Sequence, residues 1–475
     1  MSPGKEVEIC DLDNKHLGVL HVDTFVAIPS ANYFIIIIDS YTDFSFLASK
    51  LIRSRSWNPF AKFIILLFNY VQNDKINIEY VEKVLSCLFK YNAVNIVIAV
   101  PQARNFRNAI IYSWRPYDPP KYCGYFNETA KDRLVKTNLC ERGMLKYNTL
   151  IFEDKIPHDM NGCVMEVLAL QRQPFISESE QNASIEKVMI DRVLRRFKMK
   201  AHYHFLEEIR GERENVGEWN GALKQLSAKN GHLLLGGIFP DFDVHEDFET
   251  STTYLAGCLY LGCPESCQNS SVAAYQTKLF DVLTRPSYDY QMKTVQELVD
   301  SGIKFGGFGV LRDLFYNSSD PFDNLIGEKW VSIENITEAL IDVAVHRNFS
   351  VLCSRLELSH ISAVTPQLSD TTGNYNYFTF PDNVFSVPIE TIALRGFPFM
   401  LKFSTTITLF KQSGINEALR YQFKEFTERR RARQLRDLLK EKSDVSPLSA
   451  KHLQGGFFAL FLGMLVAFSF LLPKS

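Results

Sequence analysis

The 475-residue sequence lacks an excess of charge of either sign and the short motifs that mark common enzymes. Lys and Arg number 52 against 54 Asp and Glu, so no basic excess indicates a nucleic-acid partner. There is no Gly-rich phosphate loop after the first predicted strand, no nucleophile elbow and no HExxH motif. We therefore expect no enzyme, no catalytic residue, no cofactor and no nucleic-acid partner.

Cysteine is also sparse, with nine scattered residues that form no recognisable disulfide framework. Cys258, Cys263 and Cys267 are loosely spaced, but neither a CxxC pair nor paired histidines accompany them. We therefore expect structural or free thiols there and no metal site. Cys123 and Cys140, in a polar stretch, are the best candidates for a disulfide.

Apolar residues, by contrast, are plentiful, at 46% of the chain with 37 Phe, which favours a strand-rich or membrane-associated protein. Residues 453–472 form a run of about twenty residues without a charge, the length that crosses a bilayer as a helix. We expect one transmembrane helix there and a membrane location, most simply the plasma membrane. The basic run 429–436 before it predicts a solvated helix face, with lipid headgroup contact as the alternative.

The side of the membrane on which the chain lies is ambiguous. The first residues contain no apolar h-region, which predicts no secretory signal peptide and hence a tail-anchored cytosolic protein. Six Asn-x-Ser/Thr sequons favour an extracellular, glycosylated chain instead. They lie at Asn127, Asn182, Asn269, Asn317, Asn335 and Asn348.

The first 114 residues alternate strand and helix signals, which predicts an α/β lobe of Rossmann-like architecture with a parallel sheet. Residues 33–38, 62–68 and 95–100 are apolar strands, and apolar residues at helical spacing lie between them. The polar, Pro-containing residues 115–143 read as a linker.

Two further α/β units follow, at residues 144–265 and 266–445. Strands are predicted at 162–170, 200–207, 303–308 and 349–352, with a helix over 185–197 capped by Ser184. Two adjacent lobes suggest a hinged clamshell like that of periplasmic binding proteins. The alternative is a pair of α/β domains with unrelated roles.

An ordered series of short segments resembles insect ionotropic receptors, divergent relatives of ionotropic glutamate receptors. The C-terminal third carries Arg395-Gly396-Phe397-Pro398-Phe399, Lys411-Gln412-Ser413-Gly414-Ile415 and Pro447-Leu448-Ser449. Upstream, Tyr275-Gln276 and Thr294-Val295-Gln296-Glu297-Leu298 match the start of the second lobe, and Gly217-Glu218-Trp219-Asn220-Gly221 matches the first lobe more weakly. The resemblance covers roughly residues 145–475.

This resemblance implies a chemosensory, ligand-gated cation channel subunit. Its partners would be a small odorant or tastant, co-receptor subunits and membrane lipid. The sequence departs from the family plan near Pro264, where about ten residues stand in place of the two membrane helices and the pore loop. We therefore expect a ligand-binding membrane protein without a pore of its own. The alternative is a tail-anchored or soluble two-lobed binding module.

The resemblance also indicates where the ligand would bind. His245 stands about where glutamate receptors have the Arg that binds the ligand carboxylate, and Ser354 stands near the acid that binds the ligand ammonium. Thr252 and Gly309 complete the set that we expect to contact the ligand. His245 alternatively reads as a solvated loop histidine and Ser354 as a strand-end serine.

Overall fold

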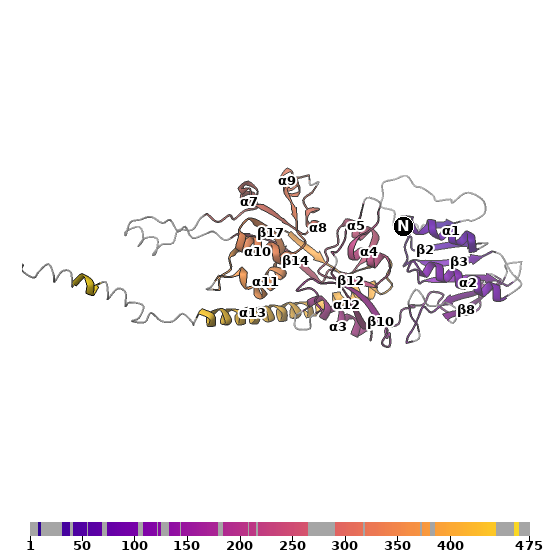
Figure 1. The fold of residues 1–475 in the computed structure, drawn as a ribbon. Coiled ribbons are helices and arrows are strands. Elements are labelled where there is room, and N and C mark those ends of the chain that lie inside the picture. The colour runs from indigo at the N-terminus through magenta and orange to yellow at the C-terminus, as the bar shows by residue number, and fades with distance from the viewer. Residues whose placement is uncertain are drawn as a thin grey trace, which may run out of the picture.

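The chain folds into three α/β units in a row, followed by a long helix (Figure 1). The computed structural model describes residues 8–10, 31–38, 41–54, 56–68, 74–102, 108–120, 122–124, 133–142, 144–178, 184–207, 209–214, 217–264, 290–316, 319–370, 373–380, 385–442 and 460–464. The N-terminal unit (indigo) lies at one end, the first lobe in the middle and the second lobe at the other end. The fold is therefore α/β, as the sequence predicts.

The N-terminal unit is built on a seven-stranded sheet in the order β1-β2-β3-β4-β5-β8-β9. The first four strands are parallel and the last three antiparallel. The elements are β1 (Glu8–Cys10), β2 (Tyr33–Ile38), α1 (Tyr41–Ile52), β3 (Lys62–Leu67), α2 (Asp74–Phe89), β4 (Ile96–Pro101), β5 (Asn108–Trp114), β8 (Leu134–Glu141) and β9 (Met144–Leu145). The three strands predicted in the first hundred residues are confirmed: alternate residues of β2 and β3 are buried, and β4 is buried almost throughout.

The predicted linker at 115–143 is wrong, because most of its described residues belong to strands. β6 (Tyr117–Asp118) pairs with β7 (Tyr122–Cys123), and β8 pairs with β5 along its whole length. β8 has only one fully buried side chain, that of Asn138. This strand next to the sheet edge mixes apolar and polar residues without the regular alternation of a half-buried strand, so it resembles a linker in sequence.

The first lobe is a five-stranded sheet in the order β11-β10-β12-β20-β13, and parallel pairing is limited to β11, β10 and β12. Its elements are β10 (Val164–Leu170), α3 (Ile185–Arg196), β11 (Lys200–Leu206), α4 (Gly221–Ser227), β12 (Leu233–Leu235), α5 (Phe242–Asp247), β13 (Phe248–Thr250), β20 (Ile392–Leu394) and α12 (Met400–Gln412). Ser184 precedes α3 as predicted, but its hydroxyl accepts a hydrogen bond from Ser177 N instead of capping the helix.

The second lobe is a six-stranded sheet in the order β16-β15-β17-β14-β18, with β19 paired to β14. Its strands are β14 (Leu255–Pro264), β15 (Lys304–Gly307), β16 (Val331–Ser332), β17 (Phe349–Ser354), β18 (Tyr377–Thr379) and β19 (Phe385–Ile389). Its helices are α7 (Val295–Ser301), α8 (Gly309–Arg312), α9 (Pro321–Lys329), α10 (Ile336–Ile341), the π-helix η2 (Asp342–His346), α11 (Arg355–Val364) and the 3-10 helix η3 (Pro366–Leu368).

Two neighbouring segments carry the chain between the lobes. Residues 251–254 lead from β13 in the first sheet to β14 in the second, and residues 390–391 lead back from β19 to β20. The two segments bind each other, since Ser251 N donates to Thr391 O at 2.9 Å and Thr391 N donates to Ser251 Oγ at 3.0 Å. The lobe boundary therefore lies near residue 254, not at 265–266 as predicted, and the first lobe is completed by residues beyond 391. Paired crossing segments of this kind form the hinge of a clamshell.

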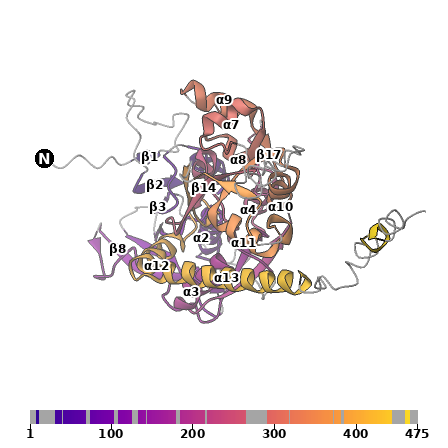
Figure 2. The ribbon, with the colours of Figure 1, turned by 90° about the vertical axis from the view of Figure 1, so that its left-hand side faces the viewer.

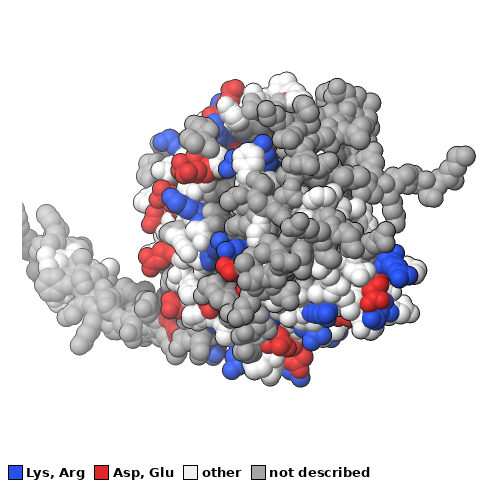
Figure 3. Space-filling model, turned by 90° about the vertical axis from the view of Figure 1, so that its right-hand side faces the viewer, with Lys and Arg blue, Asp and Glu red and all other residues white. Residues whose placement is uncertain are grey.

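The N-terminal unit and the first lobe share one hydrophobic core, while the second lobe has cores of its own. Across the junction, Tyr117 packs edge-on against Phe399, and Asn92 Nδ2 donates to Arg395 O at 2.8 Å. Figure 3 views the molecule from the N-terminal end, where acidic and basic side chains are interspersed over the described surface.

The long helix α13 (Ile415–Lys442) runs beneath α11 and contacts it (Figure 2). Its basic run is partly solvated, as predicted, with Arg429 paired to Glu425 at 2.5 Å. Arg431, however, packs over the Tyr375 ring at 4.1 Å. None of the helices among the described residues has the length and hydropathy to cross a bilayer. Of the predicted span at 453–472, only 460–464 are described, as exposed helix, so that span stays a prediction.

Candidate functional site

The two lobes meet around Arg172, which lies two residues after the buried end of β10 at Leu170. Its Nε donates to Glu357 Oε1 in the second lobe at 2.6 Å, and its Nη1 donates to Gly237 O in the first lobe at 3.0 Å. The guanidinium also lies over the rings of Phe175 and Phe308, at 5.3 and 4.6 Å from their centroids. Arg172 thus bridges the cleft between the lobes by an ion pair and by packing.

The local structure of α11 determines where the Glu357 carboxylate lies. Ser354 ends β17 and caps α11, accepting from Glu357 N at 3.2 Å, and Glu357 Oε2 accepts from Ser354 N at 3.4 Å. This capping box holds the carboxylate at the helix start, where the macrodipole also favours a negative charge. The Glu357 side chain is 1% exposed, so Arg172 is the cation that compensates its burial.

Gln173, the residue after Arg172, makes a second contact between the lobes. His360 of α11 shares a hydrogen bond of 2.7 Å between its Nε2 and Oε1 of Gln173. The other nitrogen, Nδ1, is buried without a hydrogen-bond partner among the described residues. Burial, with the nearby Arg430 as a smaller cause, lowers the pKa of His360 to about 4. The imidazole is therefore neutral at pH 7 and donates its Nε2 proton to Gln173.

Behind Arg172 lies a fully buried carboxylate, that of Glu186 in the first turn of α3. It accepts from Gly236 N at 2.8 Å, Gly237 N at 2.9 Å and Tyr254 OH at 2.7 Å. Burial raises the pKa of Glu186, although these hydrogen bonds and Arg172 oppose the shift.

The turn that holds Glu186 requires glycine. Gly236 and Gly237 both have positive φ, and a Cβ on Gly236 would lie 2.5 Å from Leu170 Cβ. Only glycine lets two successive N–H groups meet one carboxylate here. Glu186 thereby connects α3, the first sheet and the hinge residue Tyr254.

The same cleft has a side rich in acidic groups. Arg210 Nη2 pairs with Asp241 Oδ2 at 2.5 Å, and Asp241 also caps α5 by accepting from Val244 N. Asp313, at the end of α8 in the second lobe, lies near Glu212 and Asp241 of the first. Partial removal from water, followed by repulsion from these two carboxylates, raises the pKa of Asp313. Arg210 and Arg312 oppose this shift, so the three carboxylates on this side of the cleft face two guanidinium groups.

Two of the four predicted ligand residues lie beside these interlobe contacts. Gly309 begins α8, and a Cβ there would lie 3.3 Å from Glu212 Oε1 across the cleft. Ser354 is buried and caps α11, so its hydroxyl is engaged in the helix start.

The other two make their described contacts within the first lobe. His245 is exposed near the end of α5, with its Nδ1 3.4 Å from Thr250 Oγ1. Thr252 is exposed, and its N–H donates to Ser404 Oγ at 3.1 Å. The structure does not bring the four residues together around one point.

The two charged residues that bridge the cleft cannot be identified from the sequence. Arg172 and Glu357 lie 185 residues apart and belong to no motif. The one available signal is the Ser354-x-x-Glu357 pattern, which predicts a capping box but not the partner of its acid.

The predicted disulfide between Cys123 and Cys140 is wrong. Cys123 is joined to Cys163, while Cys140 is a free thiol on β8. Cys163 lies just before β10, so the disulfide ties the N-terminal unit to the first lobe. The strand pairing of β8 with β5 and β9 separates Cys140 from Cys123, which sequence proximity does not indicate.

Of the six sequons, only two lie among the described residues. Asn335 is exposed and caps α10, and Asn348 is exposed just before β17. Asn127, Asn182, Asn269 and Asn317 lie outside the described residues, and so does Cys267. Glycosylation stays a prediction at all six positions.

Among the described residues, one group of side chains has metal-ligand spacing: Glu166, His202 and His204. Partial burial raises the pKa of Glu166, but hydrogen bonds from His204 and His202 lower it more, so the pKa lies below its usual value. The sequence offers no signal for this group, because its members are neither adjacent nor in a known motif.

Comparison with known proteins gives one family match. Residues 18–133 match the model of the family described as "Putative ionotropic receptor, ligand binding domain". That family is one of receptors, not of enzymes. The matched residues are those of the N-terminal unit and lie before the two lobes that the sequence resemblance covers. No curated protein matches the chain.

Solved structures give weaker likenesses. The Drosophila muscle GluRIIB in complex with glutamate is 13% identical, with a TM-score of 0.43 over 55% of this chain and 98% of that one. A Mnemiopsis leidyi ionotropic glutamate receptor ligand-binding domain in complex with D-serine is 12% identical, with a TM-score of 0.41 over 55% and 98%. At such identities and scores, these likenesses carry no argument about what this chain binds.

Proposed function

We propose that this chain is an ionotropic-receptor-like chemosensory protein that binds a small molecule between its two lobes and catalyses no reaction. The observation that carries the proposal is the pair of lobes joined by two crossing segments and bridged by Arg172 and Glu357. A clamshell whose faces contact each other through a few polar groups can open and close around a ligand. The family match and the ordered sequence resemblance support the same class.

The proposed ligand is small and carries at most one charge. A zwitterionic amino acid needs a free cation and a free anion in the cleft. The two charges at its centre, Arg172 and Glu357, are already paired, and His245 is exposed on α5. Leaving a ligand charge unpaired in a desolvated site would cost several kcal/mol.

Within this class we favour a monovalent amine. Glu212, Asp241 and Asp313 lie on one side of the cleft, and partial burial, with repulsion from the other two carboxylates as a smaller cause, raises the pKa of Asp313. An ammonium group bound there would relieve that repulsion.

Thermal-shift screening of the purified chain tests this proposal. Small primary amines should raise the unfolding temperature, and Asp313→Asn should abolish most of that rise. Asp300→Asn, which changes an exposed carboxylate on α7 of the same lobe, is the matched control and should leave the rise unchanged. Stabilisation by micromolar glutamate or glycine would contradict the proposal.

The proposed location is the plasma membrane, with the lobes outside the cell. Expression in insect cells should then give a chain whose gel mobility increases after glycosidase treatment. An unglycosylated chain would favour the alternative, a tail-anchored cytosolic binding module. Expressed without partner subunits, the chain should give no ligand-evoked current in voltage clamp, because the residues near Pro264 offer no apolar run to line a pore.

A further inference from the structure

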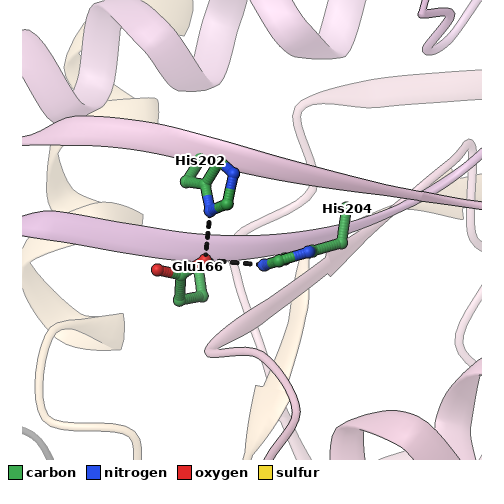
Figure 4. A group of neighbouring side chains, drawn as sticks. All are labelled: Glu166, His202 and His204. Carbon is green, nitrogen blue, oxygen red and sulfur yellow. Dashed lines mark hydrogen bonds and ion pairs between the residues drawn. The ribbon is translucent and has the colours of Figure 1, made fainter.

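Glu166, His202 and His204 gather on one face of the first lobe, away from the contacts between the lobes. Glu166 on β10 lies opposite His202 on β11 in the parallel register. His204 lies two residues further along β11, and side chains two apart on a strand share a face. Figure 4 shows both imidazole rings directed at the same carboxylate oxygen.

The distances suit a metal ion. Glu166 Oε2 lies 2.8 Å from His202 Nδ1 and 2.6 Å from His204 Nε2, and all three ligand atoms lie within 4.8 Å of one another. Tetrahedral ligands at about 2.0–2.1 Å from zinc are roughly 3.3 Å apart. Movements of about 1 Å by the carboxylate and the two imidazoles would therefore convert the hydrogen-bonded cluster into a ligand set.

The face that carries the cluster is open to solvent. Tyr203, between the two histidines, points to the other face and donates to Asp191 of α3 at 2.8 Å. The side chains of His202, His204 and Glu166 are 62%, 42% and 32% exposed. An ion can therefore reach the site, and water can complete its coordination.

We propose that Glu166, His202 and His204 form a zinc-binding site that links the edge strand β11 to its neighbour β10. Two imidazoles and one carboxylate match zinc and related divalent transition metals, whereas calcium and magnesium prefer sets of oxygen ligands. Binding requires each facing ring nitrogen to present its lone pair, so the ring proton resides on the other nitrogen. His232 helps to fix the site, because its Nδ1 accepts from Glu166 N at 3.0 Å.

Isothermal titration of the chelator-treated full chain with zinc chloride tests the site. We expect one zinc ion per chain, and no binding of calcium at the same concentration. The His202→Gln/His204→Gln double variant should weaken zinc binding more than about tenfold, since losing even an outer-shell partner commonly costs 10–100-fold. His158→Gln, which changes another exposed histidine, is the matched control and should bind zinc as the unmodified chain does.

X-ray absorption of the zinc-loaded unmodified chain provides a second measurement that needs no variant. It should show nitrogen and oxygen neighbours at about 2.0–2.1 Å. Sulfur neighbours, unchanged affinity in a folded double variant, or no zinc binding would each overturn the proposal. Circular dichroism of the variants separates loss of the site from loss of the fold.

Discussion

At the scale of single residues, His360 gives the clearest pH dependence. Burial lowers its pKa to about 4, whereas an unfolded histidine titrates near 6.5. Between these values the unfolded chain binds one more proton than the folded chain, so stability rises with pH over that window. It should be lost as pH falls from 6.5 towards 4, by up to roughly 3 kcal/mol.

The His360→Gln variant tests this directly, because the amide keeps a donor for Gln173 but does not titrate. In urea unfolding between pH 4 and 6.5, the free energy of unfolding of this variant should rise less steeply with pH than that of the unmodified chain. The difference in slope should correspond to at most one bound proton. His158→Gln should leave the slope as it is. Equal slopes in His360→Gln and the unmodified chain would show that folding does not lower the pKa of His360.

The Arg172–Glu357 pair should behave as a coupled unit. Arg172→Met leaves a carboxylate that is 1% exposed without its cation, and we expect a loss of about 3 kcal/mol in the free energy of unfolding. Glu357→Gln should cost less, and the double variant less than the two singles added. Urea unfolding of the four chains measures this coupling.

Arg420→Met is the control for this comparison of single and double variants. Arg420 pairs with Glu417 on the exposed face of α13, and such pairs contribute less than about 1 kcal/mol. Strict additivity of the Arg172 and Glu357 substitutions would mean that the ion pair does not hold the lobes together.

The cleft residues also show why the fold can be predicted from the sequence more readily than the site. Arg172 and Glu357 are ordinary charged residues in sequence, and only the pairing of two sheets across a hinge brings them together. His245, placed by resemblance to a family, lies exposed on α5 beside Thr250, so its contact with a ligand stays a prediction.

At the scale of elements, Ser354 has a structural task that the predicted ligand contact overlooked. Its hydroxyl caps α11, so Ser354→Ala should lower the free energy of unfolding by about 1 kcal/mol, with or without ligand. Ser359→Ala in the same helix removes a hydroxyl that only donates to Leu356 O, and it should be neutral or slightly stabilising. Thermal unfolding of both variants gives the comparison. Equal stability of the Ser354→Ala and Ser359→Ala variants would show that the Ser354 cap does not stabilise α11.

Element prediction succeeds where burial is strong and fails where it is weak. β2, β3 and β4 have alternate or continuous buried positions, and their bounds agree with the apolar runs to within one residue. β8 mixes apolar and polar residues without regular alternation and buries only one side chain fully, so its sequence does not distinguish it from a linker. The residues of β14 fall within the predicted first lobe but form a strand of the second sheet, because sequence order does not reveal which sheet a strand joins.

At the scale of the whole molecule, the N-terminal unit is fixed to the first lobe by several independent contacts. Lys155 reaches into the end of the N-terminal sheet and donates to Ile96 O at 3.0 Å and Ser113 Oγ at 2.7 Å. With the shared core and the Cys123–Cys163 disulfide, these contacts make the two units one body. The second lobe is joined by two crossing segments, by the contacts of Arg172 and Gln173, and by the packing of α11 against α13, so it is the part with the fewer ties to the rest.

This arrangement predicts that the disulfide stabilises the junction and not the second lobe. Cys123 and Cys163 are 40 residues apart, a separation for which loop-closure entropy gives about 4 kcal/mol. Cys163→Ser should therefore lower the unfolding temperature of the N-terminal unit and first lobe together, while Cys140→Ser, which removes a free thiol, should change it little. Peptide mapping without reductant should recover Cys123 linked to Cys163. A Cys123–Cys140 peptide, or equal effects of the two substitutions, would show that the N-terminal unit is attached to the first lobe without this bond.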